Sequence, residues 1–156
     1  MSVPRPVLDE PVRAALDDIG HPLSIASSVR DRHGELTDFR LEFVNAAAAE
    51  WTGLPRTAVV GRHVSELLPA LRTFGLFDEL RTTVETGQPF RKAGIRFVDA
   101  VIEGRNVGGR FDMGALRLGD GYLSIWQDIG DGDSESEALD QSLQDARALI
   151  PLIRLE

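Results

Sequence analysis

The stretch DFRLEFVNAAAAEWTG, residues 38–53, changes from one residue pattern to another at Asn45. Before Asn45 the large apolar residues recur at every second position, which predicts a strand over residues 37–44. After it, an alanine-rich run predicts a short helix that ends at Gly53. An asparagine can bond the backbone at the end of a strand and also cap the helix that follows. We therefore interpret Asn45 first as a structural joint and only second as a ligand contact.

A second strand and an N-terminal helix precede this stretch. Residues 23–30, LSIASSVR, predict a strand, and the turn DRHGEL after it contains Gly34, which can adopt a positive φ angle. The two strands are therefore expected to form an antiparallel hairpin. Upstream, Asp9 can cap an amphipathic helix over residues 9–19. Residues 1–8 are proline-rich and predict a disordered tail.

Helices are predicted next along the chain. Residues 55–69 predict two short pieces separated around Gly61, with Ser65 as the N-cap of the second piece. Residues 71–85 carry a broad apolar side and predict the longest helix of this cluster.

Strand patterns return in the second half of the chain. Residues 89–99 predict a strand with a bend or bulge near Gly94, and residues 100–109 predict a loop or the ragged end of a hairpin. Residues 110–118 and 122–129 predict two further strands, joined by the tight turn GDG. The five predicted strands and the central helices predict an α+β domain, in which one five-stranded antiparallel sheet carries a helical cluster on one face.

The C-terminal residues predict an acidic linker and a helix. Asp133 or Ser134 can cap this helix, and apolar residues then step by four, three, four and three. These residues form a heptad seam typical of a coiled coil: Leu139, Leu143, Ala146, Ile150 and Ile153. The alternative is a capping helix folded back on its own domain.

The order of elements and four motifs resemble the PAS family. The motifs are FRLEFVNAAAAEWTG, VVGRHVSELLP, VETGQPF and LGDGYLSIWQDIG. The last motif departs from the family in one place, because Gly130 stands where threonine is usual, although Asp128 is present. The resemblance implies a disordered tail (1–8), an N-terminal flanking helix (9–19), a PAS domain (20–131), and a linker with a C-terminal signal helix (132–156).

Composition disfavours several classes of function. The formal net charge of −8 disfavours binding to nucleic acid and to anionic membranes. The chain contains no cysteine, which removes thiolate metal sites, cysteine nucleophiles and the cysteinyl flavin photoadduct of the light-sensing PAS branch. No signal peptide or membrane-length apolar run is present, so the expected location is the cytoplasm.

No enzymatic or metal-binding motif emerges from the sequence. His21, His33 and His63 lack metal-ligand spacing, and no Ser-His-Asp set lies in one local motif. Haem is disfavoured because haem-binding relatives place a histidine on the long helix, where this chain has none. The chain is therefore expected not to be an enzyme, and its cofactor, if one exists, is not identified.

The PAS resemblance implies a space between sheet and helices that can hold a small ligand. Candidate pocket residues are Phe43, Asn45, Trp51, Leu67, Phe74, Phe77, Leu80, Ile95, Phe97, Met113 and Ile125. The alternative is a collapsed core without a ligand. The ligand is expected to be small and either apolar or acidic, and an acidic one would be anchored by Arg72, Arg96, Arg110 or Arg117.

Both alternating faces of the last strand are apolar, so both faces of the sheet need cover. An apolar outer face is a candidate surface for a homodimer. Candidate dimer residues are Val12, Leu16, Ile19, Tyr122, Trp126, Leu139 and Leu143.

Two functional hypotheses remain open. The first is a dimeric sensory module of a bacterial-type regulator, which passes a ligand- or partner-dependent change to the C-terminal helix and to an effector outside these residues. The second is a ligand-free module for protein–protein interaction or dimerisation. The heptad run near the C-terminus favours a fragment of a longer protein.

Overall fold

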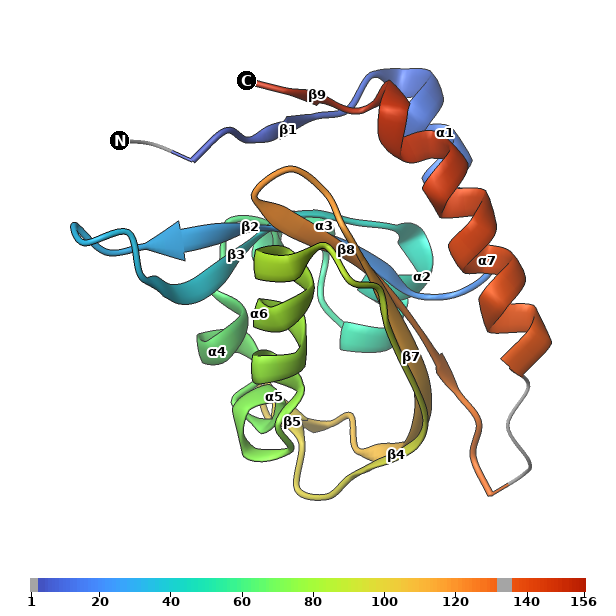
Figure 1. Cartoon of the computed structure of the whole chain (residues 1–156). Helices are drawn as coiled ribbons and strands as arrows, with labels where there is room; N and C mark the ends of the chain where they lie inside the picture. The colour runs from blue at the N-terminus through green and yellow to red at the C-terminus, as the bar shows by residue number, and fades with distance from the viewer. Residues whose placement is uncertain (1–2, 132–135) are drawn as a thin grey trace.

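The computed structural model describes residues 3–131 and 136–156, and its central element is an antiparallel sheet (Figure 1). The sheet strands in these residues are Leu23–Arg30 (β2), Leu36–Val44 (β3), Phe90–Phe97 (β4), Gly109–Arg117 (β7) and Gly121–Asp128 (β8). Their order across the sheet is β3-β2-β8-β7-β4. The predicted α+β class with five antiparallel strands is therefore confirmed.

A cluster of short helices covers one face of the sheet (Figure 1). The single helix predicted over residues 71–85 is wrong, because Gly75 adopts a left-handed conformation with φ of 76° and divides it. The N-cap predicted at Ser65 is also wrong, since His63 occupies that position. The helices of the cluster are Ala46–Thr52 (α2), Arg56–Val59 (α3), Val64–Leu67 (α4), Ala70–Thr73 (α5) and Leu76–Thr86 (α6).

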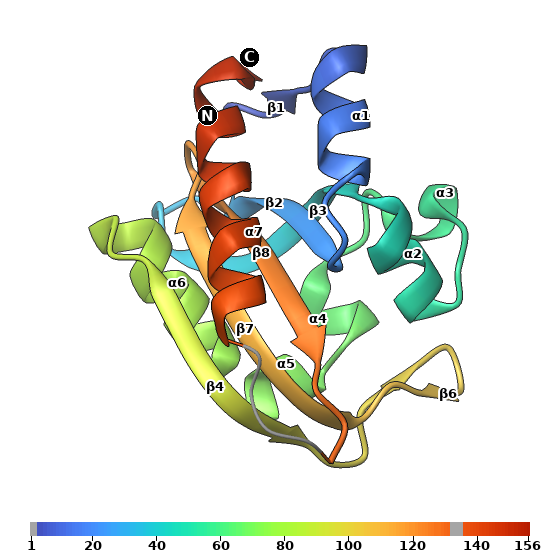
Figure 2. The same ribbon diagram turned by 90° about the vertical axis from the view of Figure 1, so that its right-hand side faces the viewer.

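Two helices from opposite ends of the chain cover the other face of the sheet. Helix α1 (Glu10–Asp17) and helix α7 (Ser136–Leu149) lie side by side there, as Figure 2 shows. The N-caps predicted for α7, Asp133 and Ser134, lie outside the described residues.

The two ends of the chain are joined by backbone pairing beside these helices. Strand β1 (Pro6–Val7) pairs antiparallel with strand β9 (Arg154–Leu155), which follows the short 3-10 helix η1 (Ile150–Leu152). The amide of Arg5 also donates to the carbonyl of Glu156 at 2.7 Å. The disordered tail predicted over residues 1–8 is therefore wrong from Arg5 onward, because the C-terminal strand supplies hydrogen-bond partners for it.

The sheet separates two hydrophobic cores. One core lies between the sheet and the helical cluster, and it includes Tyr122 with Trp126 packed against it. The other lies under α1 and α7, and it includes Leu123 and Ile125. The sequence had placed Ile125 in the pocket and Tyr122 and Trp126 on the outer face, and this assignment is wrong. Alternation shows which residues share a face, but not which of two apolar faces meets which helices.

A β-bulge in β3 changes the face of the sheet to which the Phe43 side chain points. Ile25 pairs with Phe43, but the next residue of β2, Ala26, pairs with Leu41, so β3 has one additional residue at Glu42. An extra residue reverses the alternation beyond it. Phe43 therefore packs in the core under α1 and α7, and its assignment to the pocket is wrong.

A small hairpin extends the turn between β4 and β7. Strands β5 (Val101–Ile102) and β6 (Arg105–Asn106) pair within the segment predicted as a loop or ragged hairpin end. Ile102 on this hairpin is fully buried. The bulge predicted in β4 is confirmed, since the register shifts between Lys92 and Ile95 and Gly94 has φ of 65°.

Candidate functional site

A cavity of about 80 Å³ lies between the sheet and the helical cluster. Strands β2, β3, β4, β7 and β8 form one side, helices α2 to α6 form the other, and Ile102 of the small hairpin closes part of the wall. Apolar side chains dominate the lining because the two layers bury their facing surfaces against each other. This cavity is the candidate functional site.

The structure brings together in this cavity more than half of the pocket residues predicted from the sequence. The predicted residues that line it are Trp51, Leu67, Leu80, Ile95, Phe97 and Met113. Each comes from an element whose period placed it toward the sheet–helix interface. These residues therefore bear out the expectation that the two layers enclose a shared space.

The remaining five predicted pocket residues do not line the cavity. Phe43 and Ile125 lie in the core on the other side of the sheet. Phe77 packs against Phe39, with ring centroids 5.2 Å apart, and Phe74 packs on Phe97. The side-chain amide of Asn45 is occupied by hydrogen bonds to the backbone, which are described below. The helical period of Phe74 and Phe77 showed that they face inward, but not that neighbouring rings rather than the cavity would take up their side chains.

Sequence reasoning missed several lining residues on the sheet. Tyr122, Ser124 and Trp126 line the cavity from alternate positions of β8, and Ser24 faces it from β2. A signal was present, because a small polar residue in the middle of a buried strand needs a buried partner. Ser24 and Ser124 supply that partner for each other, with their Oγ atoms 2.8 Å apart.

The polar groups of the lining bond mostly to one another. Burial raises the pKa of Tyr122, and the nearby negative charge of Asp38 acts in the same direction, while a hydrogen bond with Ser24 opposes them. Thr52 Oγ1 donates to the carbonyl of Ala49 at 2.8 Å. The Tyr122 hydroxyl therefore keeps its proton at neutral pH and remains a neutral member of the wall.

An unbroken row of aromatic rings forms one part of the site. Trp126 meets Trp51 at 5.2 Å between ring centroids, and Trp51 meets Phe111 at 5.8 Å, both edge to face. Phe111 then contacts Phe97 at 5.7 Å, and Phe97 contacts Phe74 at 5.3 Å. Phe111 is buried, whereas the other four rings are partly exposed, so this aromatic row connects the cavity wall with the surface.

No charged side chain lines the cavity among the described residues. Arg72, a predicted anchor for an acidic ligand, instead donates to Ser65 Oγ and to the Thr37 carbonyl, both at 2.7 Å, and stacks over Phe77. The other predicted anchors, Arg96, Arg110 and Arg117, also lie outside the lining. An anionic ligand would have no cation in contact with it.

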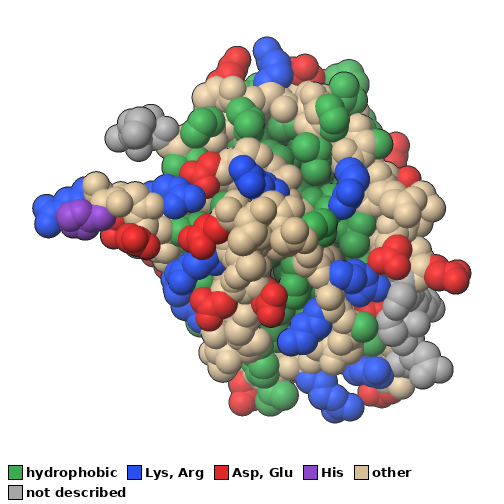
Figure 3. Space-filling model, in the orientation of Figure 1, with side chains coloured by type: hydrophobic (Ala, Val, Ile, Leu, Met, Phe, Trp, Pro, Cys, Tyr) green, Lys and Arg blue, Asp and Glu red, His purple; other side chains and the backbone are tan. Residues whose placement is uncertain are grey.

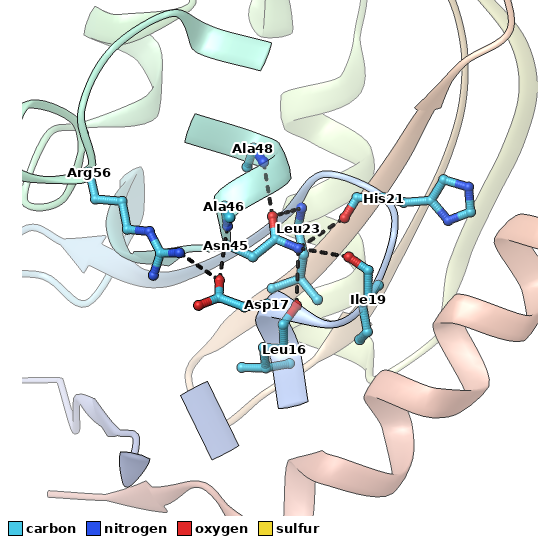
Figure 4. Close-up of polar contacts among 9 residues, drawn as sticks. All are labelled: Leu16, Asp17, Ile19, His21, Leu23, Asn45, Ala46, Ala48 and Arg56. Carbon is cyan, nitrogen blue, oxygen red and sulfur yellow. Dashed lines mark hydrogen bonds and ion pairs between the residues drawn. The ribbon is translucent and has the colours of Figure 1, made fainter. Parts of the chain in front are cut away.

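Asn45 joins three elements at the edge of the site (Figure 4). Its Oδ1 accepts from the amide of Leu23 at 3.0 Å and from the amide of Ala48 at 2.9 Å. Its Nδ2 donates to the carbonyls of Leu16 at 3.1 Å and His21 at 2.9 Å. The fully buried side chain thus caps α2 and ties it to α1 and β2. This supports its interpretation as a structural joint.

A second polar contact strengthens the same joint. Asp17 of α1 accepts from the amide of Ala46 at 2.9 Å and from Arg56 Nη2 at 2.7 Å (Figure 4). The helix on the outer face is therefore connected to α2 and α3, which border the cavity.

Helix α7 is seated on the outer face of the sheet by packing and polar contacts. Leu139 and Ala146 of the heptad seam are fully buried there, and Ile153 is also buried. Ser142 Oγ lies 2.8 Å from His21 Nδ1. The seam therefore packs on its own domain, which is the alternative that the sequence left open.

The seven residues predicted to form a dimer are all packed within the chain. The candidates on α1, on α7 and at Ile19 contribute to the outer core, and Leu143 is partly buried against it. Tyr122 and Trp126 face the cavity on the opposite side of the sheet. A dimer through the predicted side chains of α1 or α7 would require these helices to leave the sheet.

Charged and metal-ligating side chains of the described residues are not concentrated in one place on the face drawn in Figure 3. Positive and negative side chains are interspersed over the face drawn in Figure 3. Within residues 3–131 and 136–156, no group of three metal-ligating side chains lies together. None of the helices in these residues combines the length and the apolar character that crossing a membrane requires.

Comparison with known proteins identifies a similar fold. A family model described as the PAS fold matches residues 37–105. The PAS domain of nitrogen regulation protein NR(II) from Vibrio parahaemolyticus is 15% identical, with a TM-score of 0.53, over 78% of this chain and 100% of that one. No curated protein sequence matches the chain.

Two further solved structures extend the similarity. The LOV protein of Rhodobacter sphaeroides is 18% identical, with a TM-score of 0.58, over 87% of this chain and 80% of that one. The blue-light activated histidine kinase of Erythrobacter litoralis is 20% identical, with a TM-score of 0.54, over 87% of this chain but only 41% of that one. At these identities the likeness is one of fold, and it confirms the resemblance seen in the sequence.

Proposed function

Because this chain contains a PAS domain, we propose that it is the sensory module of a signalling protein, in which the cavity binds a small ligand and α7 carries the response. One observation carries the proposal. Adjacent residues of the same strands face the cavity and the output helix: Met113 lines the cavity, whereas Gly114 lies against Leu143 of α7. A ligand that displaces β7 would therefore also change the contact between Gly114 and Leu143 of α7.

Strand β8 provides a second connection between the two sides. Tyr122 and Trp126 line the cavity, while Leu123 and Ile125 pack in the core under α1 and α7. Packed interfaces respond to small displacements by changing between discrete arrangements rather than by deforming continuously. A ligand that binds one arrangement more tightly shifts the population of the helix position.

The proposal includes a homodimer and an effector. When α7 leaves the sheet, its seam of Leu139, Leu143 and Ala146 becomes available to a second copy of the chain or to a partner protein. The module itself is proposed to be non-catalytic and cytoplasmic, as part of a bacterial-type regulator. Two of the similar structures, the PAS domain of a nitrogen regulation protein and a blue-light activated histidine kinase, support a role in signalling.

The proposal is tested by ligand screening followed by hydrogen exchange. A thermal-shift screen of small uncharged compounds, with native mass spectrometry, is expected to find a compound that binds and raises Tm. That compound is then expected to change amide exchange over α7, Ser136–Leu149. A bound compound that leaves this exchange unaltered would contradict transmission to α7.

A second candidate function is a ligand-free interaction module. The cavity volume of about 80 Å³ favours it, because pockets for drug-sized ligands usually measure about 300–1,000 Å³. Absence of any bound mass and of any stabilising compound would support this second function. The outer face of the sheet or the seam of α7 would then be the interaction surface once α7 leaves the sheet.

A further inference from the structure

Trp126 lines the cavity and carries one unusual polar atom. Its Nε1 atom is buried, and within the described residues it has no hydrogen-bond partner. Of the cavity-lining side chains in the described part of the chain, Trp126 alone has such an atom. A buried donor without a partner is costly, and native proteins seldom retain one without a reason.

The small polar side chains of the wall are already engaged. Ser24 and Ser124 bond to each other, and Thr52 donates to a backbone carbonyl. Among the described residues of the wall, the indole N–H of Trp126 is the buried hydrogen-bonding group that these contacts leave without a partner. An indole nitrogen is a donor only, so its natural partner is an acceptor.

The remaining properties of the wall restrict the ligand further. No charged side chain lines the cavity among the described residues, so an ionised ligand would lose its hydration without gaining a counter-charge. The rings of Trp51 and Phe111 beside Trp126 offer their faces and edges to flat apolar groups. The wall is thus suited to an uncharged molecule with an apolar body.

We propose that the cavity takes a small uncharged ligand with a compact apolar or aromatic body and one hydrogen-bond acceptor, which receives the N–H of Trp126. This inference rests on the proposed function, because it names the class of ligand for the same site. The cavity of about 80 Å³ is smaller than the roughly 150 Å³ cavity that holds benzene in an engineered protein. The ligand is accordingly no larger than a single ring, and the partly exposed rings of the aromatic row yield to admit it.

Pyridine and benzene form a matched pair of probes at pH 8, where pyridine is uncharged. Their rings have nearly the same size, and only pyridine offers an acceptor. Acetone supplies a smaller acceptor if ring size limits entry. The chain has two tryptophans, so a ¹H–¹⁵N spectrum contains two indole signals, which Trp51→Phe and Trp126→Phe assign.

The expected result concerns one of these two signals. Pyridine or acetone moves the Trp126 indole signal downfield in the unmodified protein, whereas benzene produces no downfield shift. In addition, Trp126→Phe weakens pyridine binding about tenfold more than it weakens benzene binding, because only pyridine loses a hydrogen bond. Trp51→Phe, a matched change in the same wall, alters the two affinities by the same factor.

Two outcomes would overturn the inference and separate it from the proposed function. If the probes bind but neither acceptor moves the Trp126 signal, the cavity remains a ligand site and the assigned ligand class is wrong. If acetate or benzoate binds more tightly than the uncharged probes, the class is wrong in the same way. If no probe binds, the ligand class is wrong, whereas the sensory function is decided separately by the ligand screen and the amide exchange of α7. The signal shift is measured without a variant, so misfolding of Trp126→Phe cannot obscure it.

Discussion

Leu143 of α7 occupies the space directly above Gly114 of β7. A Cβ atom on Gly114 would lie 2.5 Å from Leu143 Cδ1, closer than real Cβ contacts allow. Gly114 follows Met113, which lines the cavity from the opposite face of the sheet. The absence of a side chain at this one position therefore lets α7 approach the strand that borders the site.

Replacement of Gly114 by alanine should loosen α7. The new methyl group collides with Leu143, and overpacking of this kind costs about 1–3 kcal/mol of the free energy of unfolding. Chemical denaturation and amide exchange over Ser136–Leu149 measure the two effects. Gly20→Ala is the matched control, because nothing lies within 4 Å of a Cβ built there.

A second substitution tests the origin of this effect. Leu143→Ala removes the colliding atoms, so Gly114→Ala should cost less in a Leu143→Ala background than in the unmodified chain. Equal costs in both backgrounds would show that Leu143 does not sense the residue at position 114.

Substitution of Asn45 should destabilise the fold strongly. Asn45→Ala leaves the amide of Leu23 and the carbonyl of His21 without their side-chain partner, whereas the Leu16 carbonyl keeps the bond from the amide of Ile19. Each buried group left unpaired costs about 1–3 kcal/mol, so the total loss is at least about 2 kcal/mol. Urea denaturation followed by circular dichroism measures it.

The aspartate variant separates the two halves of the amide. Asn45→Asp keeps the acceptor that caps α2 but directs an oxygen at backbone carbonyls, so it should destabilise more than alanine at neutral pH. A variant as stable as the unmodified protein would show that the Nδ2 bonds contribute nothing.

Tyr122 should make the protein sensitive to alkali. Burial raises the pKa of Tyr122, so the unfolded chain ionises it near its ordinary pKa of about 10 while the folded chain keeps the proton. Above about pH 10 the unfolded state binds fewer protons, and the free energy of unfolding falls by up to about 1.4 kcal/mol per pH unit.

Tyr122→Phe should remove this part of the alkaline slope. The chain has a single tyrosine, so absorbance at the tyrosinate band reports Tyr122 alone. Denaturation of both proteins between neutral pH and pH 11 gives the difference. Tyrosinate that forms before unfolding begins would contradict the buried, protonated hydroxyl.

The pair of Arg30 and Asp120 should contribute stability that disappears in acid. Arg30 Nε and Nη2 donate to the two carboxylate oxygens of Asp120 at 2.9 Å, and these hydrogen bonds hold the pKa of Asp120 below its usual value. The contribution is therefore present above about pH 4, the unfolded pKa, and is lost as the pH falls through the folded pKa.

Asp120→Asn measures this contribution. Because both side chains are partly exposed and screened by solvent, the expected loss is about 1 kcal/mol at pH 7. The unmodified and variant proteins should converge in stability toward pH 2. A difference that stays constant down to pH 2 would assign the effect to packing or turn geometry instead of charge.

Local patterns predicted most of the secondary structure. Strand β2 has the predicted bounds, Leu23–Arg30, and α2 lies between Asn45 and Gly53 as predicted. Strand alternation, an asparagine cap and a glycine stop each depend on a few neighbouring residues, so a single sequence is enough to predict them. The long helix was divided at Gly75, because tertiary packing used the left-handed conformation that glycine permits.

By itself the sequence determined that a five-stranded α+β fold would form and that Asn45 would join a strand to a helix. Only the tertiary structure decided which face of the sheet encloses the cavity. Both faces are apolar, so alternation alone does not distinguish them. The bulge at Glu42 also places the Phe43 side chain on the face opposite to those of Phe39 and Leu41. Likewise, the spacing of Leu139, Leu143 and Ala146 suits a second helix or a sheet equally well. The seam packs on this chain's own sheet because Gly114 leaves room for Leu143 there.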